Sequence, residues 1–96
     1  MKLSEIRKTK EIEVEGVKVK IQDLSWPDFM SSLEIDDLME RGAFRLVKAI
    51  IEWDLQDDDG KPLPVSEENI KKLPAKIIMP LVEATREVFA SEKKKN

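Results

Sequence analysis

Prolines and an acidic turn interrupt the chain between Trp53 and Pro74, and this interruption limits how the chain can fold. An apolar run ends at Trp53, and the Asp-Asp-Asp-Gly sequence at 57–60 is a turn signal. Pro62 and Pro64 then restrict the next segment to extended or polyproline-like geometry, because each ring fixes φ. The chain therefore divides into elements before this joint and elements after it.

A short helix is predicted directly after the proline arm, over Glu67–Lys72. Ser66 is placed to cap it, and its acidic first turn and basic last turn both suit the helix dipole. Residues 92–96 are polar and are expected to form a frayed tail.

The last helix is predicted from Pro74, which fits a first turn, to about Ser91. Pro80 lies inside this span, where its ring clashes with the carbonyl of Lys76 and its nitrogen has no hydrogen to donate. We therefore expect either a kink at Pro80 or a helix that begins near Met79.

Alternating apolar residues predict a β-hairpin over residues 10–21, after a loosely packed lead at residues 1–9. A two-residue loop at Glu15-Gly16 would put four apolar side chains on one face, and Gly16 can adopt the positive φ of a tight turn. These four residues are Ile12, Val14, Val17 and Val19. A lone hairpin is not stable in water, so it is expected to pack on the helices.

Helices are predicted between the hairpin and the joint. Ser25 can cap a first helix, with Pro27 in its first turn and Asp28 in a shortened capping box. The apolar residues of its face are Trp26, Phe29, Met30 and Leu33. The span to Glu40 is compatible with one helix or two, and Gly42 predicts a break.

A broad apolar stripe predicts a helix over Ala43–Trp53, which would be the central buried helix. Together these elements predict a single domain over residues 10–91, helical from residue 25. The predicted fold class is mainly α (α+β), with three to five helices and an N-terminal β-hairpin.

Composition limits the chemistry. The chain has no histidine and no cysteine, which removes the commonest general base, the commonest metal ligand and every thiolate. Ser25 and Ser66 have no base partner in sequence, so they are interpreted as caps. We expect no enzyme activity, no cofactor and no metal.

Charge and hydropathy limit the partners. The acidic residues concentrate in residues 21–60, and the net charge is −3, which argues against a nucleic-acid-binding face there. No apolar run approaches the about 18 residues of a transmembrane helix, and no signal-peptide core is present, so a membrane partner is not expected.

The acidic turn at 57–60 resembles part of a calcium loop but does not match one. An EF-hand loop places glycine sixth, between an acidic first ligand and a glutamate at the end. With Gly60 sixth, these end positions hold Leu55 and Ser66. The turn is therefore interpreted as a solvated turn held by aspartate side chains.

The stretch from Trp53 to Pro74 resembles the tail assembly chaperones of long-tailed bacteriophages and prophages. Members of that family often combine Trp-x-Leu, an acidic turn, Gly-Lys-Pro-Leu-Pro, a Ser/Thr-Glu-Glu helix start and Leu-Pro before a last helix. Here these motifs are residues 53–55, 57–59, 60–64, 66–68 and 73–74. Pro80 departs from the family pattern.

The resemblance implies a non-enzymatic protein that binds the tape measure protein and keeps it soluble during tail assembly. It implies the tail tube protein as a further partner, the host cytoplasm as the location, and absence from the finished virion. It leaves a homo-oligomer open. The rival interpretations are a tail or head–tail structural component retained in the virion, and a small regulatory binding protein.

A chaperone of this kind needs an apolar groove for amphipathic helices. We expect it between the helix of Ala43–Trp53 and the last helix, or on the outward side of the last helix. Trp26 is a core residue or an interface anchor, whereas Trp53 is expected in the core. The residues assigned to partner binding are Trp26, Phe29, Leu81, Val82, Val88 and Phe89.

Overall fold

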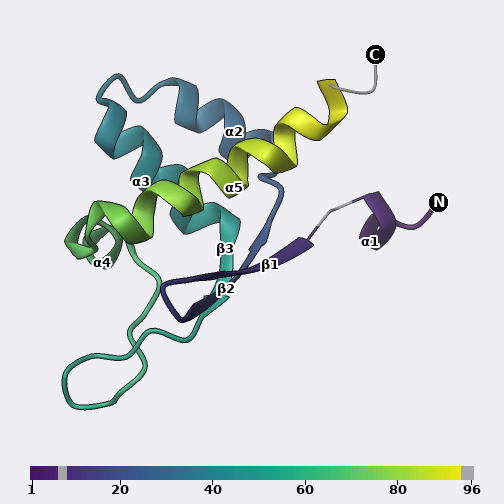
Figure 1. Ribbon diagram of the computed structural model, residues 1–96. Coiled ribbons are helices and arrows are strands. Elements are labelled where there is room, and N and C mark those ends of the chain that lie inside the picture. Colours follow the sequence, from purple (N-terminus) through teal and green to yellow (C-terminus); the bar gives the residue numbers. More distant parts are fainter. Residues whose placement is uncertain (7–8, 94–96) are drawn as a thin grey trace.

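The computed structural model describes residues 1–6 and 9–93, and in this part of the chain it shows an α+β fold (Figure 1). Three antiparallel strands form one sheet in the order β1-β2-β3, and the described residues also form five helices. The elements are α1 (Leu3–Ile6), β1 (Thr9–Val14), β2 (Val17–Gln22), α2 (Trp26–Leu33), α3 (Leu38–Ala49), β3 (Ile50–Trp53), α4 (Glu67–Lys72) and α5 (Ala75–Lys93).

The N-terminal hairpin forms with the predicted register. Ile12 pairs with Val19, and Val14 pairs with Val17. Both loop residues have positive φ, 51° at Glu15 and 81° at Gly16, as a tight two-residue hairpin turn requires. The register turns one apolar face inward, and the prediction of an N-terminal hairpin is confirmed.

A third strand replaces the end of the predicted Ala43–Trp53 helix. The helix α3 ends at Ala49, and the chain continues into β3, which pairs with β2 through Val19–Trp53 and Ile21–Ile50. The prediction was wrong here because an apolar run of β-branched residues fits a strand as well as a helix. The free edge of β2 supplies the backbone partners that settle the choice.

The break between α2 and α3 lies earlier than predicted. α2 ends at Leu33, and Asp37 caps α3 by accepting a hydrogen bond from the Glu40 N–H at 2.9 Å. Two helices therefore cover the span to Glu40. The predicted break at Gly42 is wrong, because Gly42 lies inside α3. The Asp37 cap before Gly42 and the buried Leu46 after Gly42 stabilise the helix across this position.

The helices after the joint follow the prediction in part. Ser66 caps α4 over the predicted residues and accepts from the Asn69 N–H at 3.1 Å. α5 begins at Ala75, so the alternative start near Met79 is wrong, and Pro80 lies within the helix. The carbonyl of Pro74 accepts the first N–H bonds of α5, which fixes its start before Pro80.

The two ends of the chain are described only in part. Leu3–Ile6 form a short helix whose apolar side chains are exposed, and residues 7–8 lie outside the described residues. α5 continues to Lys93, two residues into the predicted tail, and residues 94–96 also lie outside the described residues.

The core lies between the inner face of the sheet and the helices α3, α4 and α5. Figure 1 shows α5 crossing in front of α3, with the sheet below them. α3 contributes buried Ala43, Leu46 and Ala49, which lie in the part of the predicted Ala43–Trp53 helix that is helical. The most buried apolar residues are Val19, Ile21, Leu46, Ala49, Ile70 and Leu81, each at most 3% exposed.

Trp53 ties the proline arm to the sheet. Its indole N–H donates to the Leu63 carbonyl at 2.6 Å, and its ring packs against the core while remaining half-buried. A second hydrogen bond fixes the next residue of the arm, because the side-chain amide of Asn69 in α4 donates to the Pro64 carbonyl at 2.8 Å.

Candidate functional site

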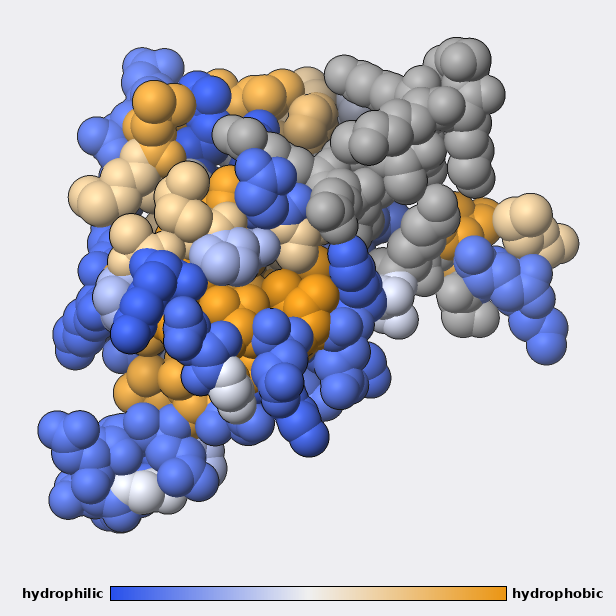
Figure 2. Space-filling view, viewed as in Figure 1, coloured by the Kyte–Doolittle hydropathy of each residue, from blue (hydrophilic) through white to orange (hydrophobic). Residues whose placement is uncertain are grey.

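The acidic turn is held by hydrogen bonds between its own backbone N–H groups and an aspartate side chain. One carboxylate oxygen of Asp57 accepts from the N–H groups of Asp59 and Lys61, each at 2.9 Å, and Gly60 takes a φ of 82°. Figure 2 shows this loop as a hydrophilic projection at the lower left. Across the described residues, no group of three or more acidic side chains is arranged to hold a metal ion. The geometry agrees with a solvated turn held by aspartate.

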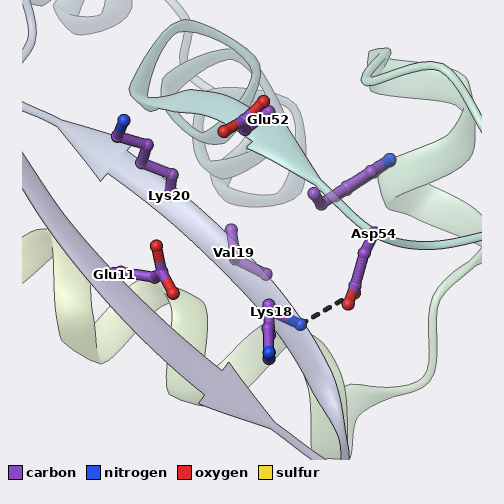
Figure 3. A pocket seen from close by; sticks show the side chains of 7 residues that line it. Glu11, Lys18, Val19, Lys20, Glu52 and Asp54 are labelled. Atoms are coloured by element: carbon purple, nitrogen blue, oxygen red, sulfur yellow. Dashed lines mark hydrogen bonds between the residues drawn. The ribbon is translucent and has the colours of Figure 1, made fainter.

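A shallow hollow of about 240 Å³ lies on the outer face of the sheet (Figure 3). Glu11, Lys20 and Glu52 are cross-strand neighbours there, so the charges alternate across the three strands. The Asp54 carboxylate accepts the Lys18 backbone N–H at 2.8 Å. Charged neighbours of opposite sign that face water are what the solvated side of an antiparallel sheet requires, and they define no binding site.

Two adjoining hollows of about 280 and 410 Å³ lie between α3 and α5. They share four residues, so we treat them as one depression, the α3–α5 groove. The shared residues are Leu38, Gly42, Leu46 and Val82. The smaller hollow extends to Met39, Ala43, Ile70, Lys71, Leu73, Ala75 and Ile78, and the larger extends to Leu24, Arg41, Arg45, Ala49 and Thr85.

Large apolar side chains stand exposed at the mouth of the groove. Leu38 is 78% exposed and Met39 is 64% exposed, both in the first turn of α3. Leu46 is buried and forms part of the floor, and Val82 of α5 is half-buried on the opposite wall. Exposed apolar residues beside an apolar hollow are typical of protein-binding surfaces.

The charges at the groove are cationic. Arg41 donates through Nε to the Ile35 carbonyl at 2.8 Å, and Arg45 donates through Nε to Ser32 Oγ at 2.9 Å. The Arg45 guanidinium also lies 5.6 Å from the centre of the Phe29 ring, a cation–π arrangement. Burial, followed by the neighbouring Arg41 charge, lowers the pKa of Arg45.

Lys71 provides the third cation and differs from the arginines because it has a carboxylate partner. It forms an ion pair with Glu40 that joins α4 to α3, and this hydrogen bond raises the pKa of Lys71. No aspartate or glutamate is among the described residues that line the groove.

The residues predicted to bind a partner do not form one surface. Trp26 is 72% exposed on α2, Phe29 is half-buried under Arg45, and Leu81 is fully buried, so its side chain belongs to the core. Val82 lines the groove on both hollows. The side chains of Val88 and Phe89 lie outside the described residues.

Sequence reasoning missed the part of α3 before Ala43 that lines the groove. Leu38, Gly42 and Leu46 recur every four residues, so they share one helix face, but the predicted break at Gly42 separated them. Had α3 been started at the Asp37 cap, this spacing would have marked the groove wall. The expected location between the central helix and the last helix agrees with where the hollows lie.

The fold and the groove define this protein as a small α+β domain with a cation-rimmed apolar groove. No protein-family model, curated protein or solved structure matches the chain. Within the described residues, no helix combines the length and the apolar character needed to cross a membrane.

Proposed function

We propose that this chain is a non-enzymatic tail assembly chaperone of a long-tailed phage or prophage, which binds the tape measure protein and keeps it soluble. The observation that carries the proposal is the α3–α5 groove, with Leu38 and Met39 exposed at its mouth. The resemblance of residues 53–74 to that family supports the same conclusion.

The groove has the properties that binding an amphipathic helix requires. An apolar helix face gains free energy when it leaves water, and a groove between two helices receives it along its length. The remaining surface is rich in charge, since 39% of the residues are charged, and this keeps a complex soluble. In this proposal the tail tube protein is a further partner, and the chain acts in the host cytoplasm.

The test is co-expression of the chain with a fragment of a tape measure protein encoded beside it. We expect the soluble fraction of the fragment to rise several-fold over expression alone. The groove variant Met39→Glu should lose most of this rise, because it places a negative charge at the apolar groove mouth.

Met79→Glu is the matched control for Met39→Glu. Met79 is also an exposed methionine, at 58%, but it lines neither hollow. The control variant should therefore solubilise the fragment as the unmodified chain does. If the unmodified chain leaves the fragment insoluble, the proposed function is wrong. If both variants act alike, a different surface binds.

A further inference from the structure

Gly42 has no role in the fold that requires a glycine. It lies inside α3 and does not have positive φ, and a Cβ added there meets no atom within 4 Å. Glycine within a helix is destabilising relative to alanine. Gly42 does line both hollows, between Leu38 and Leu46 on the same face. Its missing side chain keeps the middle of the groove open.

Arg41 and Arg45 give the groove a charge opposite to that of the whole chain. They are one helical turn apart, about 6 Å along the axis of α3. In the described residues their side chains donate to a carbonyl and a hydroxyl and lie over an aromatic ring, and none of these groups is anionic. Each guanidinium has five N–H donors, so both keep donors for a carboxylate that enters the groove.

We propose that the α3–α5 groove receives an acidic amphipathic helix, whose apolar face lies over Gly42 and whose carboxylates pair with Arg41 and Arg45. This inference deepens the proposed function and rests on it, because it specifies the kind of tape measure segment that binds. Carboxylates spaced three or four residues apart on the partner helix match two arginines one turn apart.

The charge of the rest of the chain adds selectivity. The net charge is −3, so the cations at the groove have the opposite sign to the whole chain, and an acidic helix is attracted at the groove and repelled at the acidic turn of residues 57–60. A basic helix would meet the opposite pattern, with repulsion at Arg41 and Arg45 and attraction at the acidic turn. Charge therefore selects both the partner and the face on which it binds.

The test uses three synthetic helical peptides of about 18 residues, or about 27 Å. They share one leucine stripe, and the positions beside the stripe are glutamate, glutamine or lysine. Binding to the full chain is measured by fluorescence anisotropy. The glutamate peptide should bind about tenfold more tightly than the glutamine peptide, and the lysine peptide should bind most weakly. Added salt should reduce the difference.

Variants of the chain separate the two parts of the inference. Gly42→Leu fills the groove and should abolish binding of all three peptides, whereas Gly42→Ala should keep most of it. Arg41→Gln with Arg45→Gln should remove the preference for glutamate and leave the glutamine peptide unaffected. Circular dichroism of each variant checks that the fold is retained.

Each outcome has a defined meaning. Equal affinity for the three peptides would overturn the charge assignment, and undiminished binding by Gly42→Leu would overturn the groove assignment. Sedimentation that shows a dimer of the chain, lost in Gly42→Leu, would identify a second copy as the occupant and overturn the acidic partner. The proposed function is tested separately. It is wrong if the tape measure fragment remains insoluble while the peptides still bind.

Discussion

Gly16 and Gly42 are the same residue type in two backbone conformations, and their replacement by alanine should have opposite effects. Gly16 has a φ of 81° in the hairpin turn, where a Cβ is strained, whereas Gly42 has ordinary helical geometry with free space around it. We expect Gly42→Ala to raise the free energy of unfolding by about 0.5–1 kcal/mol. Gly16→Ala should lower it by about 1 kcal/mol or more.

The measurement is thermal unfolding followed by circular dichroism. For a domain of this size, a change of 1 kcal/mol moves Tm by about 4–8 °C, so the two variants should melt on either side of the unmodified chain. A lower Tm for Gly42→Ala would mean that the glycine has a role in packing, which would contradict open space at the middle of the groove.

Individual side chains also show where sequence reasoning was sufficient. The caps at Ser25 and Ser66 were predicted from residue type and spacing, and both accept the expected backbone N–H. Capping depends on neighbours three residues away, so local sequence determines it. The binding assignments to Phe29 and Leu81 depended on which helix face is buried, and that face is set by packing between distant elements.

Among the helices, α5 contains the residue that helix propensity disfavours most, Pro80. It lies within the helix, where its nitrogen cannot donate to the Lys76 carbonyl, and its ring crowds that carbonyl. Pro80→Ala restores a donor and should raise the free energy of unfolding by about 1–3 kcal/mol. Urea unfolding should show a higher midpoint with an unchanged m-value.

Pro74→Ala is the control for this prediction. Pro74 precedes the first residue of α5, where no intrahelical N–H bond is required, and its carbonyl accepts from Ile77 and Ile78 in either form. Its replacement should change the free energy of unfolding by about 0.5 kcal/mol or less. If the two variants behaved alike, the helix around Pro80 would already be relaxed, and the restored donor would gain nothing.

The elements that the sequence predicted best are those fixed by local signals. The hairpin register follows from alternation around Glu15-Gly16, and α4 follows from Ser66 and its charged turns. The strand β3 could not be predicted in the same way. Ile50 and Ile51 continue an apolar run that began as a helix, and only pairing with β2, about 30 residues earlier in the sequence, distinguishes strand from helix.

The candidate site was predictable only in part for the same reason. Val82 and the position between two helices followed from the apolar stripes. Leu38, Met39 and Arg41 did not, because the predicted break at Gly42 separated them from the Ala43–Trp53 helix, and Arg45 was not assigned a role although it lies in that helix. An error of one helix boundary thus removed the first turn of α3 from the groove wall.

The molecule carries its charged surface and its apolar groove on different sides. The outer face of the sheet carries cross-strand charges of alternating sign, and the acidic turn projects into water (Figures 2 and 3). The helical side carries the groove, the exposed Leu38 and Met39, and the cations. This division suits a protein that holds one apolar partner on one side while the other side maintains solubility.

A groove that holds a helix fits a temporary chaperone and also a component that stays in the particle, so the composition of the finished particle decides between them. We expect mass spectrometry to detect this chain in lysates of cells that assemble tails and to find it absent from purified virions. The tail tube and tape measure proteins, detected in the same virion samples, serve as the positive control. Detection of this chain at a fixed ratio to them would contradict the chaperone proposal and favour a structural tail component whose groove stays occupied after assembly.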